Sequence, residues 1–156
     1  MSEQQQVSQY CDIRKIYLKD ISLETPNSPG IFNERQLELK SEIRLETRAM
    51  SLSQDLFEVL LTVTVKSTLG ERTAYLAEIQ QAGIFSLRGF EDSQVGHMLH
   101  AFCPNILFPF AREEMASLIG KSGFPYLLLN PVNFDGLYMQ QLRQQISTTG
   151  TVQATQ

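Results

Sequence analysis

The 156-residue chain has 42% hydrophobic residues, and its 13 Lys and Arg against 17 Asp and Glu give a formal net charge of -4. This size and apolar content fit one globular domain with a core of its own, and an acidic chain without a block of basic residues is a poor match for nucleic acid. The opening MSEQQQVSQY lacks the positive charge and apolar stretch of a signal peptide, and no later run is as apolar as a membrane span, so we expect a cytoplasmic protein.

Both ends of the chain are polar. Residues 1–9 and 147–156 contain few apolar side chains, which predicts flexible tails around one domain at residues 10–146. The two cysteines, Cys11 and Cys103, match neither a metal-ligand spacing nor a disulfide framework. We expect both to be structural thiols.

Four segments between the tails have the alternation or β-branched runs of β-strands, and turn residues bound each of them. The second is the clearest, because apolar residues at odd positions alternate with charged residues. The connections are too short for helical crossovers, which predicts an antiparallel sheet. The predicted strands are Ile13–Thr25, Leu37–Thr47, Asp55–Thr68 and Thr73–Ile84.

The second half of the chain is predicted to be helical. Apolar residues recur at near-helical spacing from about Ser93 to about Ile119, and a shorter helix is predicted from Phe134 or Asp135 to about Gln145. Two prolines, Pro104 and Pro109, fall inside the first of these segments and must either end that helix or bend it. Strands followed by helices are typical of an α+β domain with its helices on one side of the sheet.

Catalytic and metal chemistry find no support in the sequence. His97, His100 and Cys103 lie three residues apart, but the third position rotates away from the first and the neighbouring residues are apolar. No nucleophile, phosphate-binding loop or histidine partner accompanies the acidic residues of the strands. We therefore expect no enzyme, no metal and no cofactor.

One face of the predicted sheet carries a group of acidic residues. Asp20 and Glu24 share one face of the first strand, and Leu76 and Glu78 have matching parity on the fourth. Antiparallel sheets often leave one face in water. The group is therefore either a solvated sheet face or an acidic docking surface around one exposed leucine.

Four long blocks of the sequence resemble the SecB family of bacterial protein-export chaperones. They are YLKDISLETPNSP, EIQQAGIF, CPNILFPFARE and GFPYLLLNPVNFDGLY, and they occur in family order between Tyr17 and Tyr138. The resemblance implies a four-stranded antiparallel sheet beside a long, proline-bent helix and a shorter C-terminal helix. It also implies a dimer of dimers, no cofactor and no catalysis.

The resemblance further implies a function and a partner. Family members hold unfolded precursor proteins without ATP and deliver them to the SecA motor for export through the Sec translocon. The positions that match Asp20, Glu24, Leu76 and Glu78 dock the basic, zinc-bearing C-terminal segment of SecA in the family. These four residues are therefore the predicted SecA-binding site.

A surface that holds many unfolded clients needs a long groove with apolar and aromatic walls. The apolar stripe of the second strand, with a phenylalanine on the third, is one predicted wall, and the final helix is predicted to close the opposite side. The predicted client-binding residues are Leu39, Ile43, Leu45, Phe57, Leu137, Tyr138 and Leu142.

Two alternative functions remain open from the sequence. One keeps the SecB fold but has it protect an aggregation-prone antitoxin of a toxin–antitoxin system. The other is a domain whose apolar groove binds a lipid-like small molecule.

Overall fold

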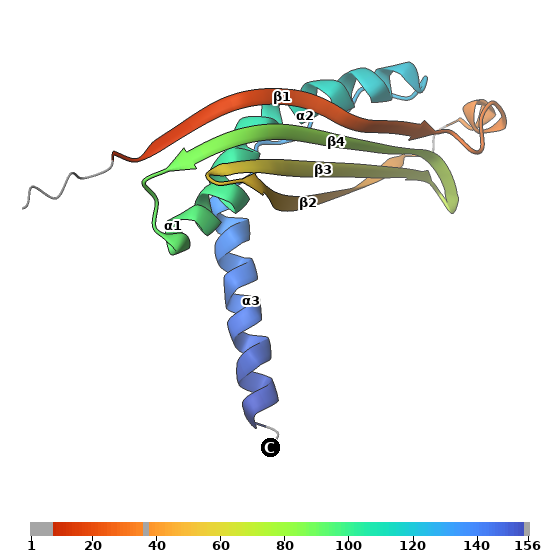
Figure 1. The fold of residues 1–156 in the computed structure, drawn as a ribbon. Coiled ribbons are helices and arrows are strands. Elements are labelled where there is room, and N and C mark those ends of the chain that lie inside the picture. Colours follow the sequence, from red (N-terminus) through yellow and green to blue (C-terminus); the bar gives the residue numbers. More distant parts are fainter. Residues whose placement is uncertain (1–7, 36–37, 155–156) are drawn as a thin grey trace, which may run out of the picture.

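The computed structural model describes residues 8–35 and 38–154, and it is built around one four-stranded antiparallel sheet. The long strands curve across the molecule, and helices pack behind one of their faces (Figure 1). In spatial order the strands run β1-β4-β3-β2, so β1 and β2 are the edges. The strands are β1 (Tyr10–Glu24), β2 (Leu39–Ser53), β3 (Leu56–Leu69) and β4 (Arg72–Arg88).

Tight turns set the register of the sheet. Asp55, in the turn between β2 and β3, and Gly70, in the turn between β3 and β4, both have positive φ angles of 64° and 62°. Such left-handed residues match the turn to the twist of the flanking strands. The first strand, β1, pairs with the last strand, β4, without a tight turn between them. Its register with β4 shifts between Ile13 and Lys15 and again between Leu18 and Asp20.

The two faces of the sheet differ in burial. Along β3, the odd-numbered residues Val59, Leu61, Val63 and Val65 are fully buried, while the residues between them are partly accessible. The odd-numbered residues of β4 are buried in the same way, against α2 (Cys103–Lys121). The sheet therefore has one covered face toward the helices and one open face.

The four predicted strands are confirmed, but the predicted C-terminal ends of the second and fourth strands come too early. β2 continues past Thr47 to Ser53, and β4 continues past Ile84 to Arg88. Cross-strand pairing extends both strands where alternation along the sequence has faded, for example at Ala49, which pairs with Val59. The predicted start of the second strand at Leu37 lies outside the described residues.

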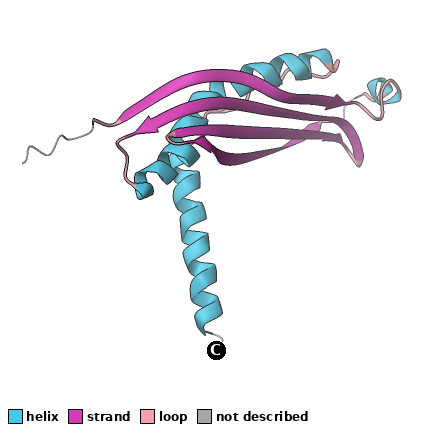
Figure 2. Ribbon diagram, viewed as in Figure 1, coloured by secondary structure: helices cyan, strands magenta, loops and turns pink. Residues whose placement is uncertain are grey.

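The predicted long helix is confirmed, and it runs continuously through three helical segments. α1 (Asp92–His97) leads into a π-helical turn, η2 (Met98–Phe102), and then into α2 (Figure 2). Pro104 stands in the first turn of α2, where a missing N–H costs little, while its ring would crowd the carbonyl of His100. The wider π turn directly before it relieves that crowding. Pro109 alone lies in the helix interior.

The C-terminal helix, α3 (Phe134–Ala154), continues nine residues beyond its predicted end at Gln145. Its first turns lie against η2, and the rest projects away from the sheet (Figure 1). The predicted C-terminal tail at residues 147–156 thus overlaps the end of this helix. The short 3-10 helix η1 (Gly30–Asn33) completes the elements.

Candidate binding surfaces

The sheet register brings the four predicted SecA-binding residues together on the open face. Leu76 stands directly opposite Glu24, and Glu78 stands opposite Ser22 one row further along the strands. Asp20 follows in the next row, opposite Gln80. Asp20 and Glu24 are exposed on the edge strand, whereas Leu76 and Glu78 are half-buried in the middle of the sheet. The grouping predicted from strand parity is therefore present.

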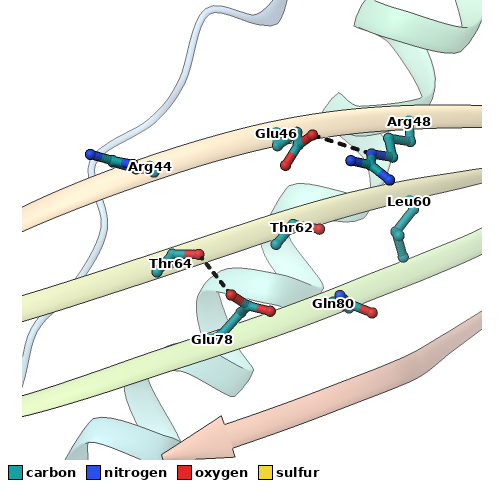
Figure 3. Close-up of a pocket in the computed structure, with 8 residues that line it drawn as sticks. All are labelled: Arg44, Glu46, Arg48, Leu60, Thr62, Thr64, Glu78 and Gln80. Carbon is teal, nitrogen blue, oxygen red and sulfur yellow. Dashed lines mark hydrogen bonds and ion pairs between the residues drawn. The ribbon is translucent and has the colours of Figure 1, made fainter.

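Glu78 also borders a shallow hollow of about 410 Å³ in the open face (Figure 3). Its carboxylate accepts a hydrogen bond from Thr64 Oγ1 at 3.3 Å. Across the hollow, Arg44 and Arg48 of β2 pair with Glu42 and Glu46 on the same strand, at 3.3 and 3.2 Å. Such exposed pairs contribute little stability and exchange partners easily. The lining residues are Arg44, Glu46, Arg48, Leu60, Thr62, Thr64, Glu78 and Gln80.

Sequence reasoning missed a polar cluster on the same face, which links β1 to β3 across β4. Tyr17 donates its phenolic hydrogen to Glu58, and Lys19 Nζ lies 2.7 Å from the other oxygen of that carboxylate. The hydrogen bonds from Lys19 and Tyr17 lower the pKa of Glu58, while partial burial and the same carboxylate raise the pKa of Tyr17 to about 12. The register shift in β1 next to Lys19 makes this contact possible, and shifts of this kind are not visible in strand alternation.

The covered side of the sheet has an apolar hollow next to β2, which we call the client hollow because two of the predicted client-binding residues line it. It measures about 200 Å³ and lies between Ile43 and Leu45 on one side and the segment that leads into α3 on the other. Phe108 of α2 contributes to the lining. The complete lining is Ile43, Leu45, Phe108, Leu129, Asn130, Pro131 and Val132.

Two more of the predicted client residues, Leu39 and Phe57, lie on the same covered side but outside the lining of this hollow. Leu39 stands four residues before Ile43 on the same face of β2, half-buried against the core. Phe57 lies six residues along β3 from Val63, the partner of Leu45, or about 20 Å away. The stripe thus runs along the whole covered side of the β2–β3 pair, with the client hollow nearer one end.

The structure does not bring the predicted residues of α3 into the lining of the client hollow. Tyr138 and Leu142 are half-buried on the side of α3 that packs on η2, and Leu137 is exposed. The wall opposite β2 is formed instead by Leu129–Val132. The sequence signal for it was the run GFPYLLLNPVNF, in which apolar residues recur inside a proline-bounded connection.

The residues weighed as metal ligands have other contacts. His97 Nε2 lies 2.5 Å from Asp135 Oδ1, and His100 stacks on the ring of Tyr138. Burial raises the pKa of the Cys103 thiol and of the Cys11 thiol next to it, so both stay protonated. Within residues 8–35 and 38–154, no three His, Cys, Asp or Glu side chains are grouped closely enough to hold a metal ion.

Several apolar side chains of the covered side remain accessible in the single chain. Ile13, Leu18 and Ile21 of the edge strand β1 stand opposite buried residues of β4, yet each is about 40% exposed. Phe102 and Phe110 are similarly exposed on η2 and α2.

Within the described part of the chain, no helix has the length and hydropathy needed to span a membrane.

The curved sheet thus has two different hollowed surfaces, an open charged face and a covered apolar side. The family model for preprotein translocase subunit SecB matches residues 3–145. A protein-export protein SecB from Nitrosococcus oceani is 52% identical over 148 residues, which cover 94% of this chain and 89% of that protein. The chain therefore belongs to the SecB family, and it acts as a chaperone of the Sec protein-export pathway.

A solved structure confirms the fold. A SecB-like chaperone from Mycobacterium tuberculosis, in complex with a ChAD peptide from the HigA1 antitoxin, superposes with a TM-score of 0.65. The match covers 78% of this chain and 90% of that one at 17% sequence identity, so it shows the fold alone. The much higher identity to an export protein does not favour the antitoxin alternative.

Proposed function

We propose that this chain holds unfolded preproteins on the covered side of its sheet and presents them to SecA, which docks on the open face. The observation that carries the proposal is the apolar hollow between Ile43, Leu45 and the Leu129–Val132 segment. Binding there requires only the burial of apolar side chains, so holding a client needs no ATP.

The client surface extends beyond that hollow. A stripe from Leu39 along β2 to Phe57 gives an extended chain several places to bury apolar side chains, and several subunits add avidity. In α3, Leu137 and Leu142 form the flank of this surface, whereas the ring of Tyr138 packs on His97 and His100. No single side chain should dominate, because a site that accepts many sequences spreads its contacts.

SecA docking uses the acidic group on the open face. Glu24 stands opposite the half-buried Leu76, and Glu78 and Asp20 follow in the next two rows of the same face. This arrangement suits a basic segment that carries one apolar contact. Charge complementarity of this kind sets the rate and specificity of the encounter and weakens with salt.

Assembly into a homotetramer, a dimer of dimers, is part of the proposal. The accessible apolar residues of β1, together with Phe102 and Phe110, lie on the helix side of the sheet, where a second copy would cover them. At roughly 25 cal/mol per Å² of apolar surface, leaving them in water is costly. Native mass spectrometry should show mainly tetramers that dissociate through dimers, and a stable monomer at micromolar concentration would contradict this.

The expected compartment is the cytoplasm, where precursors are made.

One experiment tests the proposed function as a whole. The purified protein is mixed with a precursor diluted from denaturant, and light scattering reports aggregation without ATP. Suppression of aggregation for the unfolded precursor, with no binding to the same precursor once folded, supports the proposal. A defined small molecule that copurifies and fills the hollow would instead support the lipid-binding alternative.

A further inference from the structure

The base of α3 is attached to the α1–η2 segment by an unusual set of contacts. The ring of Tyr138 stacks on His100 with ring centroids 6.0 Å apart and planes 7° from parallel. Its other neighbour is His97, whose ring meets it edge-on at 5.8 Å. Tyr138 is therefore held between two imidazoles that lie one turn apart along the chain.

Gly96 makes room for the hydroxyl group of this tyrosine. A Cβ atom placed on Gly96 would lie 2.9 Å from Tyr138 Oη, closer than real nonbonded carbon and oxygen atoms approach. The backbone of Gly96 does not have a positive φ, so its conformation does not require glycine. Glycine costs about 1 kcal/mol in a helix relative to alanine. In return, the missing side chain leaves room for the hydroxyl group of Tyr138.

Two further contacts fix the first turn of α3. Asp135 Oδ1 lies 2.5 Å from His97 Nε2, and Asn133 Oδ1 accepts a hydrogen bond from the backbone N–H of Gly136 at 3.0 Å. Phe134 is buried, with its ring 5.7 Å from that of Phe108 in an edge-on arrangement. The helix start is thus fixed by a cap, a close histidine–aspartate contact and an aromatic contact.

These contacts connect directly to the client hollow. Phe108, which receives Phe134, also lines the hollow, and the wall residue Val132 immediately precedes Asn133. Leu129 is buried and Val132 packs against the core, and at its C-terminal end the wall continues directly into the base of α3. Release of α3 from η2 would therefore loosen the C-terminal end of that wall.

We propose that these side chains form a latch, which we call the α3 latch, that positions the wall of the client hollow. The inference rests on the proposed function, because it assigns the latch a role in client holding. Tyr138 acts in it as a positioning residue, held in the space at Gly96, and the wall bears the client. The members of the α3 latch are Gly96, His97, His100, Asp135 and Tyr138.

A compensating pair of substitutions tests the latch. Gly96→Ala should release the base of α3, and adding Tyr138→Phe should restore it, because the hydroxyl that meets the new methyl group is gone. Gly120→Ala is the matched control, since a Cβ atom there meets nothing within 4 Å. Tyr138→Ala, which removes the ring stack without adding bulk to α1, is a second releasing variant.

Two measurements are made on each variant. Hydrogen exchange at the amides of residues 134–142 reports whether α3 is docked, and titration with an unfolded precursor reports client affinity. We expect Gly96→Ala and Tyr138→Ala to speed exchange about tenfold and to weaken client binding about threefold to tenfold. The double variant Gly96→Ala with Tyr138→Phe and the control Gly120→Ala should match the parent protein in both measurements.

The outcomes separate the latch from the proposed function. Equal exchange in Gly96→Ala and Gly120→Ala, or no restoration by Tyr138→Phe, overturns the latch. Faster exchange with unchanged client affinity overturns its role in positioning the client wall. A parent protein that binds no precursor contradicts the proposed function, while the exchange data still decide whether the latch exists.

Discussion

The two faces of the sheet present different chemistry on the same four strands. On the covered side, aliphatic residues of β2 and β3 face α2 and the segment that leads into α3, and they leave a small apolar hollow. On the open face, carboxylates, arginines and threonines surround a larger and polar hollow. Because successive side chains of a strand point to opposite faces, substitutions one residue apart should affect different partners.

The largest effect is expected on the covered side. The triple variant Leu39→Ala, Ile43→Ala and Leu45→Ala should weaken binding of an unfolded precursor about 100-fold, since each truncation removes roughly 1 kcal/mol of apolar contact. Isothermal titration measures the affinity, and native mass spectrometry checks that the assembly persists. SecA docking should be unchanged. An unchanged client affinity would place the groove elsewhere, with the Phe85–Phe90 region as the next candidate.

On the open face, Glu78→Lys should weaken SecA docking and leave client binding unchanged. Reversing the central charge of the acidic group should weaken SecA binding at least about tenfold at low ionic strength, and the loss should shrink as salt screens the charges. Thr64→Val, which removes the hydrogen bond to Glu78 but keeps its charge, is the milder control. Client holding should be normal in both variants. If SecA binds Glu78→Lys as well as the parent at moderate ionic strength, the docking face is wrongly assigned.

A third variant tests whether the Tyr17–Lys19–Glu58 cluster of the open face stabilises the fold or belongs to the SecA-docking surface. Glu58 has a lowered pKa because it accepts hydrogen bonds from Lys19 and Tyr17, so its ionised form stabilises the fold above its ordinary pKa. That contribution is lost as the pH falls through the lowered pKa. Glu58→Gln should therefore reduce the free energy of unfolding by about 1 kcal/mol at pH 7, and the difference should vanish at acidic pH. Denaturant unfolding at several pH values measures it. A strong loss of SecA binding in this variant would show that the cluster belongs to the docking surface.

The smallest effect should come from Ile43→Ala alone. Ile43 is 45% exposed and lines the client hollow beside Leu45, so its truncation removes only one of several apolar contacts. We expect roughly twofold to fivefold weaker client binding in the same titration. A loss as large as that of the triple variant would mean that one side chain dominates the site, contrary to the distributed surface proposed here.

Most of the sheet could be predicted from the sequence because alternation reports which face a residue occupies. Alternation places Asp20 and Glu24 on one face of their strand and Leu76 and Glu78 on one face of theirs, and the pairing of β1 with β4 brings the four together. The wall of the covered-side hollow at Leu129–Val132 is not predicted, since it lies in an irregular segment that leaves no periodic signal. The π turn at Met98–Phe102 was also missed, because it arises from the fit between Pro104 and the preceding turn and leaves no periodic signal.

The independence of the two faces can be measured directly. Client affinity is determined by titration of an unfolded precursor into the protein alone and into the protein saturated with the C-terminal docking segment of SecA. Two separate surfaces predict the same client affinity within about twofold in both cases. A client that is displaced by the docking segment, or that binds at least tenfold more weakly in its presence, would contradict the assignment of clients to the covered side and SecA to the open face.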